Sequence, residues 1–388
     1  MNTWPIVSLG SVLRNHIDAV PSTQLDTINL AGIYGFGRGL FPRGPISPLD
    51  TTYKAFHRLN AGDFVISSPK AWEGAVARIP DEFDGWFLSP VFPTFRADAN
   101  LLDTRYLDWY CKREAVWRQL QGKAQGMGAR RESVSSAQFL SLEIPLPPLP
   151  EQQALVARLD ALAEKTRQVE AHLDAVEHDA ERLLRAYIFH PPGQQMVKQP
   201  MSKMVTLRQT DVSVDRTAQY QFAGVYSFGR GVFASARKTG AEFAYERLST
   251  VHEGDFTYPK LMAWEGALGV VPAQCEGMVV SPEFPVFTIN TEVVLPEVLD
   301  IYFRTPEVWP TLAEISGGTN VRRRRLQPSA FLGYEMPVPP MTVQMKLRSL
   351  HRNVQALKKK HAAIRKANAA LLPATLERVF SLKERAHA

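Results

Sequence analysis

Two stretches of the chain carry the hydrophobic period of long helices. Over Leu155–Tyr187 apolar positions recur at alternating spacings of four and three residues, the pattern of a coiled-coil seam. A similar but more polar line runs over Leu347–Leu371. We therefore expect helices over residues 151–189 and 343–388. The expected seam positions are Leu155, Leu159, Leu162, Thr166, Val169, Leu173, Val176, Ala180, Leu183 and Tyr187 in the first helix, and Leu347, Leu350, Val354, Leu357, His361, Ile364, Asn368 and Leu371 in the second.

Shorter stretches alternate between apolar and polar positions, which is typical of strands. Gly62–Ser67, Val76–Ile79 and Phe92–Phe95 are such runs, separated by glycine and proline. Amphipathic helices are predicted over Tyr106–Leu120 and Leu299–Leu312, each with a tryptophan on its apolar side. The expected fold class is α+β, with mixed α/β globular parts and two long helices.

Proline runs mark the boundaries between the globular parts and the long helices. Pro145–Pro150 precedes the first helix and Pro337–Pro340 precedes the second. Since proline can neither continue a helix nor donate to a sheet, both runs are expected to be extended arms. The expected order is a globular domain at 1–150, a helix at 151–189, a linker without a core at 190–204, a second globular domain at 205–342 and a helix at 343–388.

The chain is a tandem repeat of one unit. Residues 30–153 align with residues 222–345 at a constant offset of 192, and 24 of the 66 ungapped positions in 30–95 are identical. Two tandem copies of equal length predict a pseudo-two-fold object. Duplex DNA is a common two-fold target of basic proteins.

Opposite charges on the two long helices predict that they pair with each other. Residues 151–189 hold eight acidic and five basic side chains, a net charge of −3, whereas residues 343–381 hold nine basic and one acidic, a net charge of +8. Pairing within one chain avoids like charges across the seam. Antiparallel pairing would place the globular parts at opposite ends of a helix pair about 58 Å long. The alternative is that each helix packs on its own globular domain.

Composition and charge narrow the class of protein. A net charge of +6 and a pI near 9.2 favour a polyanionic partner such as nucleic acid, although many enzymes are as basic. Cys111 and Cys275 do not occupy matching positions of the repeat, so a framework disulfide is not expected. The sequence shows no signal-peptide pattern and no stretch apolar enough to cross a bilayer. A cytoplasmic protein without a membrane partner is expected.

Each repeat places an arginine between two glycines, at Phe36–Gly39 and at Phe228–Gly231. Glycine permits positive φ and a close approach of the backbone to a partner. The guanidinium groups of Arg38 and Arg230 could then lie bidentate on guanine or phosphate. The alternative is a tight turn with a solvated arginine. The motif lacks the third glycine of a dinucleotide-binding loop.

A second motif, AWEGA, occurs at Ala71–Ala75 and again at Ala263–Ala267. Its glutamates could accept a hydrogen bond from the N4 amino group of cytosine, and its tryptophans could pack against a loop or a sugar. A structural turn with a core tryptophan is the alternative. The candidate DNA contacts here are Trp72, Glu73, Trp264 and Glu265, together with the preceding lysines Lys70 and Lys260.

Arginine clusters follow glycine-rich stretches in both repeats, in the sequences GMGARR and GGTNVRRRR. A flexible basic segment beside a folded domain suits phosphate contacts that position a protein without reading bases. A solvated run of charge is the alternative. The candidates are Arg130, Arg131, Arg322, Arg323, Arg324 and Arg325.

One stretch breaks the repeat. Residues 42–61 share only Tyr53 with residues 234–253, one identity in 20 positions, although both flanks match. If the two copies read different base pairs on one scaffold, the difference is expected here, whereas the alternative is a drifting surface loop. The sequence holds no phosphate-binding loop, no ligands at metal spacing and no nucleophile elbow, so no catalytic residue or metal site is proposed.

Together these features resemble the specificity subunit of type I restriction-modification systems. The resemblance rests on FGRG, GDF, AWEGA and SPxFPxF in the same order in both halves, on the basic stretches before Phe139 and Phe331, and on the arm at Ile144–Gln152 that opens a long helix. It covers nearly the whole chain. The second arm reads PVPPMTVQ and lacks the Pro-Glu of the first, and Lys260 stands at the position of Ser68, so individual contacts could differ between the halves.

The resemblance implies two target recognition domains, each of which reads one half of a bipartite double-stranded DNA site. It also implies two antiparallel helices that set the spacer and hold two methyltransferase (modification) subunits. Such a chain has no catalysis of its own, and S-adenosylmethionine, ATP and Mg²⁺ belong to the modification and restriction/translocase subunits. From the residues alone two other classes stay open: a stand-alone DNA-modifying or DNA-cleaving enzyme with an unrecognised site, and a coiled-coil scaffold that binds only protein.

Overall fold

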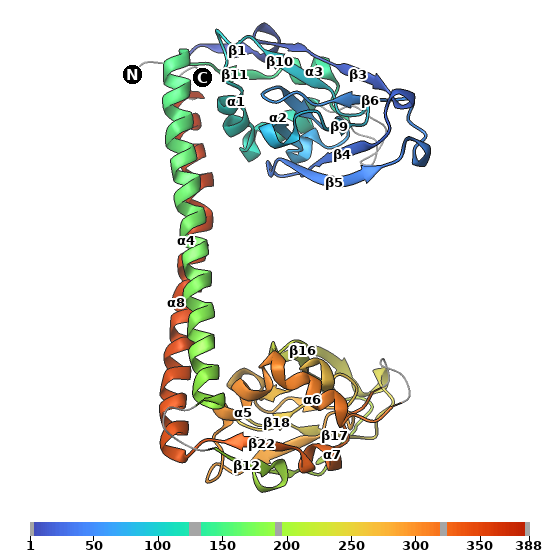
Figure 1. Ribbon diagram of the computed structural model, residues 1–388, viewed down its shortest axis with the longest axis vertical. Coiled ribbons are helices and arrows are strands. Elements are labelled where there is room, and N and C mark those ends of the chain that lie inside the picture. Colours follow the sequence, from blue (N-terminus) through green and yellow to red (C-terminus); the bar gives the residue numbers. More distant parts are fainter. Residues whose placement is uncertain (1–3, 124–132, 191–195, 319–323, 385–388) are drawn as a thin grey trace. The chain divides into compact units, whose positions relative to one another are not determined.

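The computed structural model describes residues 4–123, 133–190, 196–318 and 324–384. The chain divides into two compact units: unit 1 comprises Met1–Ala171 and Ala363–Ala388, and unit 2 comprises His172–Ala362. Each unit holds a mixed α/β domain and part of each long helix, α4 (Leu149–Phe189) and α8 (Met341–Glu384) (Figure 1). None of the described helices combines the length and apolar character that a membrane span requires.

The domain of unit 1 is built from two main sheets. One has the strand order β3-β6-β9-β4-β5, in which only β4 and β9 run parallel, the other has the order β2-β10-β7-β8, and β1 pairs with β11. The strands are β1 (Ile6–Ser8), β2 (Leu13–Asn15), β3 (Asp18–Pro21), β4 (Ile28–Ile33), β5 (Leu40–Ile46), β6 (Ala55–Arg58), β7 (Phe64–Ile66), β8 (Val76–Arg78), β9 (Phe87–Leu88), β10 (Thr94–Ala97) and β11 (Glu143–Pro145). The shorter helices are α1 (Thr104–Cys111), α2 (Glu114–Lys123) and α3 (Ser136–Leu140).

The domain of unit 2 repeats this topology strand for strand. Its main sheets have the orders β14-β17-β20-β15-β16 and β13-β21-β18-β19, and β12 pairs with β22. The strands are β12 (Val197–Pro200), β13 (Val205–Leu207), β14 (Val212–Ser213), β15 (Gln219–Tyr226), β16 (Gly231–Thr239), β17 (Arg247–Thr250), β18 (Phe256–Thr257), β19 (Gly269–Val270), β20 (Val279–Val280), β21 (Val286–Ile289) and β22 (Glu335–Val338). The shorter helices are α5 (Pro296–Phe303), α6 (Trp309–Glu314) and α7 (Pro328–Gly333). The predicted α+β class and the tandem domains are confirmed.

Stacked phenylalanines form the centre of each domain core. In unit 1 the rings of Phe64 and Phe95 are fully buried against the ring of Phe139, with centroids 5.8 and 5.0 Å away. These three residues come from β7, β10 and α3, so the cluster joins the four-stranded sheet to the segment before the proline arm. The matching residues of unit 2 pack in the same way: Phe256, Phe287 and Phe331.

Each domain core is closed by the end of the long helix that belongs to the other repeat. Leu376 and Phe380 of α8 are buried in the core of unit 1, where the Phe380 ring meets that of Tyr106 edge-on at 5.7 Å. Leu184 and Ile188 of α4, at the matching positions of the repeat, are buried in the core of unit 2. The two repeats therefore exchange helix ends.

Polar side chains pair α4 with α8 in unit 1. The Arg365 guanidinium donates to the Glu170 carboxylate at 2.7 Å, and the Asn368 amide donates to the same carboxylate at 2.8 Å. Asn368 also donates to the carbonyl of Thr166 at 2.9 Å. Hydrogen bonds from Asn368 and Arg365, in that order of size, hold the pKa of Glu170 below its usual range.

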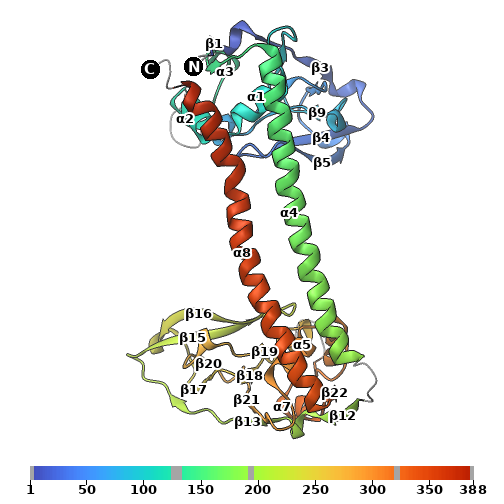
Figure 2. The ribbon, with the colours of Figure 1, turned by 90° about the vertical axis from the view of Figure 1, so that its left-hand side faces the viewer.

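The same kind of pairing joins the helices in unit 2. The Lys358 ammonium donates to the Glu181 carboxylate at 2.5 Å, and Nδ1 of the buried His361 lies 2.8 Å from the Glu177 carboxylate. Residue numbers rise along α4 as they fall along α8, so the pairing is antiparallel within each unit, and Figure 2 shows the two segments side by side. The expectation that acidic α4 pairs with basic α8 is confirmed.

The seam differs in part from the one expected from the apolar period. Leu159 and Leu173 are buried as expected, but Val169 and Leu183 are 36% and 49% exposed. On α8, Ile364 and Leu371 are 45% and 46% exposed. The physical reason is that hydrogen-bonded carboxylates, such as that of Glu170, occupy positions in the actual seam, so the line of apolar residues did not mark every contact position.

The predicted helix over Tyr106–Leu120 is in fact two helices. α1 ends at Cys111 and α2 begins at Glu114, and the buried Arg113 lies between them. In unit 2 the matching stretch is likewise divided between α5 and α6. The break turns Trp117 back so that its indole N–H donates to the carbonyl of Cys111 at 2.7 Å.

The boundary residues also differ from the expectation. Residues 196–204, assigned to a coreless linker, include strand β12 and a short 3-10 helix whose Met201 is fully buried, as is Met204. Residues 191–195 lie outside the described residues. α4 begins at Leu149, two residues earlier than expected, because proline is tolerated in the first turn of a helix and Pro150 lies there.

A buried glutamine fixes the start of each long helix to its domain. Gln152 is fully buried, and its amide oxygen accepts from the backbone N–H of Asp103 at 2.9 Å. Its amide nitrogen donates to the carbonyls of Leu101 and Pro147, both at 2.8 Å. Gln344 makes the same three bonds in unit 2, to the backbones of Leu295, Val293 and Pro339.

Replacement of Gln152 by leucine is expected to lower the free energy of unfolding by about 3 kcal/mol, because one partly buried N–H, one partly buried carbonyl and one buried carbonyl lose their partner. Urea unfolding followed by circular dichroism measures this. The matched control is Gln153→Leu, since Gln153 is the exposed neighbour on the same helix. Equal stability of the two variants would contradict the role assigned to Gln152.

The depressed pKa of Glu170 predicts a pH dependence of stability. Such a carboxylate stabilises the fold above its ordinary pKa of 4.5, and the contribution is lost as the pH falls through the lower value of the folded state. Glu170→Gln should therefore be less stable than the parent chain at pH 7, and the difference should shrink as the pH is lowered to 3. Denaturant unfolding at the two pH values tests this, and a difference that persists unchanged in acid would refute it.

Candidate nucleic-acid interface

The FGRG loops connect β4 to β5 in unit 1 and β15 to β16 in unit 2. Phe36 and Phe228 have φ angles of 61° and 63°, and among the described residues no other non-glycine residue has a positive φ. For a bulky side chain this left-handed conformation costs on the order of 1 kcal/mol. Both rings are nevertheless 63% exposed. The same strained, exposed phenylalanine thus occurs twice.

In unit 1 the arginine of this loop lies on a column of aromatic rings. The Phe41 ring covers Gly32 of the adjacent strand, which has no Cβ to obstruct it, and Phe41 stacks on Tyr34 with 4.1 Å between centroids. The Arg38 guanidinium lies 4.8 Å from the centre of the Tyr34 ring, and its Nε donates to the carbonyl of Gly35 at 3.1 Å. The Nη groups of Arg38 have no protein partner among the described residues.

Unit 2 contains the same column. Phe233 covers Gly224 and stacks on Tyr226 with 3.7 Å between centroids. The Arg230 guanidinium lies 4.6 Å from the centre of the Tyr226 ring, and its Nε donates to the carbonyl of Ser227 at 3.2 Å. In each unit the planar guanidinium is therefore oriented by stacking and one hydrogen bond, while its outer donors remain available to a phosphate or a guanine edge.

The FGRG and AWEGA motifs form one site. The backbone N–H of Phe36 donates to the carbonyl of Glu73 at 2.7 Å, and that of Gly37 donates to the carbonyl of Gly74 at 3.0 Å. In unit 2 Phe228 and Gly229 make the same two bonds, at 2.8 and 3.0 Å, to the AWEGA loop. Motifs about 35 residues apart in the sequence are thus held together by paired backbone hydrogen bonds.

Glycine is required in the AWEGA loop for two reasons. Gly74 has a φ of 78°, and a Cβ added to it would lie 2.5 Å from the Trp117 ring. Gly266 has a φ of 77°, and its added Cβ would lie 2.3 Å from the Trp309 ring. The loop therefore rests directly on the tryptophan face.

The side chains of the AWEGA motif are less available than the arginines. The indole N–H of Trp72 donates to the carbonyl of Pro69 at 3.1 Å, and that of Trp264 donates to the carbonyl of Leu261 at 3.0 Å. Both tryptophans are half-buried. The geometry favours the structural turn that the sequence left as an alternative.

The charged residues around this motif differ between the units. Lys70 donates to the Glu73 carboxylate at 2.7 Å, whereas Glu265 has no side-chain partner among the described residues. Lys260 is not the copy of Lys70, and its ammonium group donates to the carbonyl of Pro282 at 2.9 Å. Lys70 and Glu73 therefore neutralise each other, and the ammonium group of Lys260 is bonded within its own domain, which leaves Glu265 as the fourth candidate.

Residues that follow the basic stretches in the sequence are hydrogen-bonded just before the AWEGA loops. Val134 donates its backbone N–H to the carbonyl of Ser68, and its copy Leu326 donates to the carbonyl of Lys260, both at 2.8 Å. Arg325 is ion-paired to Glu283 at 2.9 Å, and Arg324 is half-buried. The remaining arginines fall outside the described residues: Arg130, Arg131, Arg322 and Arg323.

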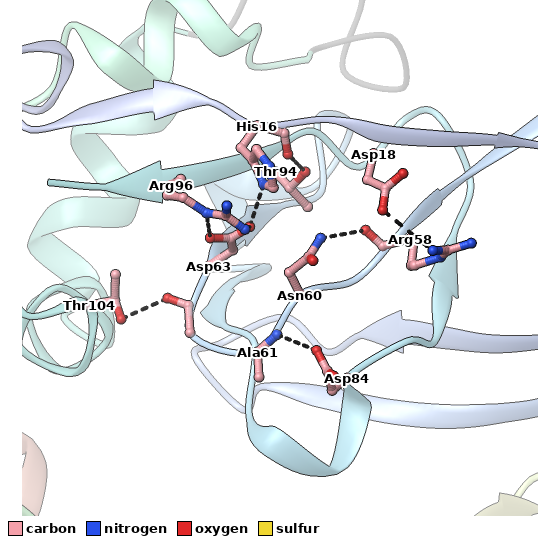
Figure 3. Close-up of polar contacts among 11 residues, drawn as sticks. His16, Asp18, Arg58, Asn60, Ala61, Asp63, Asp84, Thr94, Arg96 and Thr104 are labelled. Carbon is pink, nitrogen blue, oxygen red and sulfur yellow. Dashed lines mark hydrogen bonds and ion pairs between the residues drawn. The ribbon is translucent and has the colours of Figure 1, made fainter. Parts of the chain in front are cut away.

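A buried aspartate holds the GDF turn, as Figure 3 shows. The Asp63 carboxylate accepts from Arg96 Nε at 2.9 Å and Nη2 at 3.1 Å, and His16 Nδ1 lies 2.7 Å from it. The hydrogen bond to Asp63 raises the pKa of Arg96. In unit 2 Arg208, at the position that matches His16, donates to Asp255 at 2.6 Å. This cation–carboxylate pair fixes the turn from which β7 or β18 begins.

The stretch that differs most in sequence keeps a common turn after β5 and β16. Ser47 and Asp50 form a capping box around a short 3-10 turn, and Thr239 and Glu242 form the same box in unit 2. Leu49 at the tip of the first turn is 94% exposed. The apparently unrelated stretches therefore share a backbone scaffold and differ in the side chains that it presents.

Some residues of this site were not singled out from the sequence. Tyr34 and Tyr226, on whose rings Arg38 and Arg230 stack, occupy matching positions of the two repeats, and this match could have identified them from the sequence.

Cys111 and Cys275 are free, buried thiols, and burial raises the pKa of each. Within residues 4–123, 133–190, 196–318 and 324–384, no group of three or more His, Cys, Asp or Glu side chains is placed to hold a metal ion.

Comparison with known proteins identifies the fold. A crystal structure of the HsdS subunit from Thermoanaerobacter tengcongensis is similar over 97% of this chain and 96% of that chain, with 19% sequence identity and a TM-score of 0.55. A structure that describes complex assembly and conformational transition of the type I R-M system is similar over 98% and 96%, with 17% identity and a TM-score of 0.60. No curated protein matches the chain.

Residues 2–178 match the family model described as the type I restriction modification DNA specificity domain. Residues 2–178 therefore belong to the family of type I restriction modification DNA specificity domains. The chain as a whole shares the fold of the HsdS subunit structure.

The contact between Gly74 and Trp117 predicts how much stability is lost when a methyl group is added at position 74. Gly74→Ala is expected to lower the free energy of unfolding by about 2–4 kcal/mol, because strained φ adds to a clash. Gly85→Ala is the matched control, since Gly85 has a φ of 75° but open space around it, and it should cost only about 1 kcal/mol. Thermal unfolding of both variants measures the difference, and equal losses would rule out the clash.

Proposed function

We propose that each unit reads one half of a bipartite site in double-stranded DNA, as the specificity subunit of a type I restriction-modification complex. The observation that carries this proposal is the duplicated site in which Arg38 and Arg230 lie stacked on tyrosine with their outer N–H groups available. A guanidinium held in this way can form bidentate bonds to guanine or phosphate. We assign the first recognition domain to the residues before α4 and the second to those between α4 and α8.

We further propose that the β5–β6 and β16–β17 connections distinguish the two half-sites. Their capped turns share a backbone, whereas the residues at the tip differ, with Leu49 in unit 1 and Ala241 in unit 2. A common scaffold with different side chains is suited to the reading of different base pairs. The candidate residues Arg130, Arg131, Arg322, Arg323 and Arg324 are proposed as phosphate contacts that add affinity without sequence information.

The long helices are proposed to set the spacer between the half-sites and to dock two methyltransferase subunits. Support comes from the apolar residues that are exposed on these helices: Val169 and Leu183 are two heptads apart on α4, and Ile364 and Leu371 are one heptad apart on α8. Positions separated by whole heptads lie on one side of a helix, where they are placed for a contact with another protein. S-adenosylmethionine, ATP and Mg²⁺ would act in the methyltransferase and restriction subunits, and the complex would act on cytoplasmic DNA.

The test of this function is methylome sequencing of a host that carries the chain and its methyltransferase subunits, compared with a host that lacks only this chain. Loss of one split, two-part methylated motif is the expected result. An unchanged methylome would overturn the proposal and leave the two alternatives, a protein-binding scaffold and a stand-alone enzyme.

The arginine variants are expected to act on separate half-sites. Arg38→Ala should weaken binding to the full motif by about tenfold and relax discrimination at one half, and Arg230→Ala should do so at the other half. Loss of a phosphate contact instead would weaken binding uniformly and lower the salt slope by about one. The control is Arg167→Ala on α4, whose exposed side chain pairs with Glu164. Fluorescence anisotropy at several salt concentrations measures each case, and unchanged affinity of both loop variants would exclude these arginines.

A further inference from the structure

We propose that Phe36 and Phe228 are stacking residues, and that each places its ring against the bases of the half-site that its unit reads. This proposal rests on the proposed DNA-recognition function and adds a contact that does not depend on base sequence. The ligand at each ring is the π-face of a base at a distorted step of duplex DNA.

The backbone conformation is the first observation that supports it. The φ values of 61° and 63° are ones that glycine or asparagine adopts without the strain that a bulky residue bears. Strain of this kind persists only where the surroundings impose it, and it is concentrated at functional sites. Here the two backbone hydrogen bonds from Phe36 and Gly37 to the AWEGA loop impose it, and unit 2 repeats them.

The strain does not serve to bury the ring. Both phenylalanines are 63% exposed, so neither belongs to a domain core. Each ring leans on a tryptophan, with 5.9 Å between the centroids of Phe36 and Trp117 and 6.2 Å between those of Phe228 and Trp309. A strained backbone and a tryptophan support therefore hold an apolar ring in solvent, which is unfavourable unless a partner covers it.

The neighbouring arginine indicates the chemistry of that partner. The Arg38 guanidinium lies 6.0 Å from the centre of the Phe36 ring and has outer N–H groups available for phosphate. An aromatic ring beside a cation is the combination that binds nucleic-acid bases and their backbone together. An apolar ring can also act as a wedge between base steps of a duplex.

The duplication indicates stacking and not hydrogen-bond readout. Phe36 and Phe228 are identical although the stretches that follow them, residues 42–61 and 234–253, share one residue in 20. Their contact must therefore be with a feature that both half-sites offer. Every base has a π-face, so stacking is tolerant of sequence.

The experiment uses the full chain assembled with its methyltransferase subunits, and a duplex that carries the motif found by methylome sequencing. 2-Aminopurine is placed at successive positions of each half-site, because its fluorescence rises when it leaves the base stack. For the parent chain we expect enhanced fluorescence at one position in each half-site. Phe36→Gly and Phe36→Asn should remove the signal from one half-site and lower affinity about tenfold, and Phe228→Gly should act on the other.

Two further variants separate this role from a structural one. Phe36→Trp keeps a stacking ring and should retain the fluorescence signal. Phe36→Gly relieves the backbone strain, so its unfolding temperature should equal or exceed that of the parent chain even though it binds DNA less well. Val197→Gly removes a 64% exposed side chain from another strand and should leave the fluorescence and affinity unchanged.

Three outcomes would count against the proposal. If the parent complex binds the motif but Phe36→Gly and Phe228→Gly bind it equally well with the same fluorescence, the rings do not stack on bases. If these variants instead lose methyltransferase subunits in size-exclusion chromatography, the rings belong to a protein interface. If the parent complex shows no preference for the motif, the DNA-recognition function itself fails, which is a result distinct from the other two.

Discussion

The exchange of helix ends between the repeats is the interaction on which the rest of the fold depends. Phe380 and Leu376 complete the core of unit 1, and Ile188 and Leu184 complete that of unit 2. Each buried apolar side chain of this size contributes roughly 1.5–3 kcal/mol relative to an exposed one. Neither domain therefore has a complete core without the other repeat, and α4 and α8 cannot slide along each other without withdrawing these residues. The register of the polar pairs in the seam follows from the buried ends.

The second constraint is the contact of the AWEGA glycine with a tryptophan ring. The absence of a Cβ at Gly74 lets the loop lie on Trp117, and the FGRG loop is then hydrogen-bonded to the AWEGA backbone. Trp117 can reach this place only because the helix breaks after α1. One connected assembly is formed by the helix break at Arg113, Trp117, Gly74 and the FGRG loop. This explains why the FGRG and AWEGA motifs, which are far apart in the sequence, occur together in both repeats.

The sequence predicted the parts of the fold that have a simple period or an unmistakable charge. The strands around Phe64 and Val76, the two long helices and their pairing followed from alternation, heptad spacing and opposite charge. The prediction that Val169 and Leu183 lie in the seam was wrong. Polar residues such as Glu170 occupy seam positions, and a search for apolar spacing does not find them. Met201 and Met204 were missed because isolated methionines among proline and glutamine do not form a periodic pattern. That FGRG lies on AWEGA could not be predicted, because backbone hydrogen bonds between loops leave no trace in residue type.

The division between shared and variable residues has a physical logic. A shared arginine and phenylalanine can contribute only interactions that every half-site offers, namely phosphate charge, a guanine edge in a common position, or the face of a base. Discrimination between half-sites must then come from residues that differ, and Leu49 and Ala241 stand at matching points of two equally capped turns. Because the capping boxes fix the backbone, a substitution at the tip changes the presented side chain without altering its support. Duplication followed by change in the β5–β6 and β16–β17 turns therefore gives two readers of different sequence from one fold, while the strained loop before β5 and β16 stays the same.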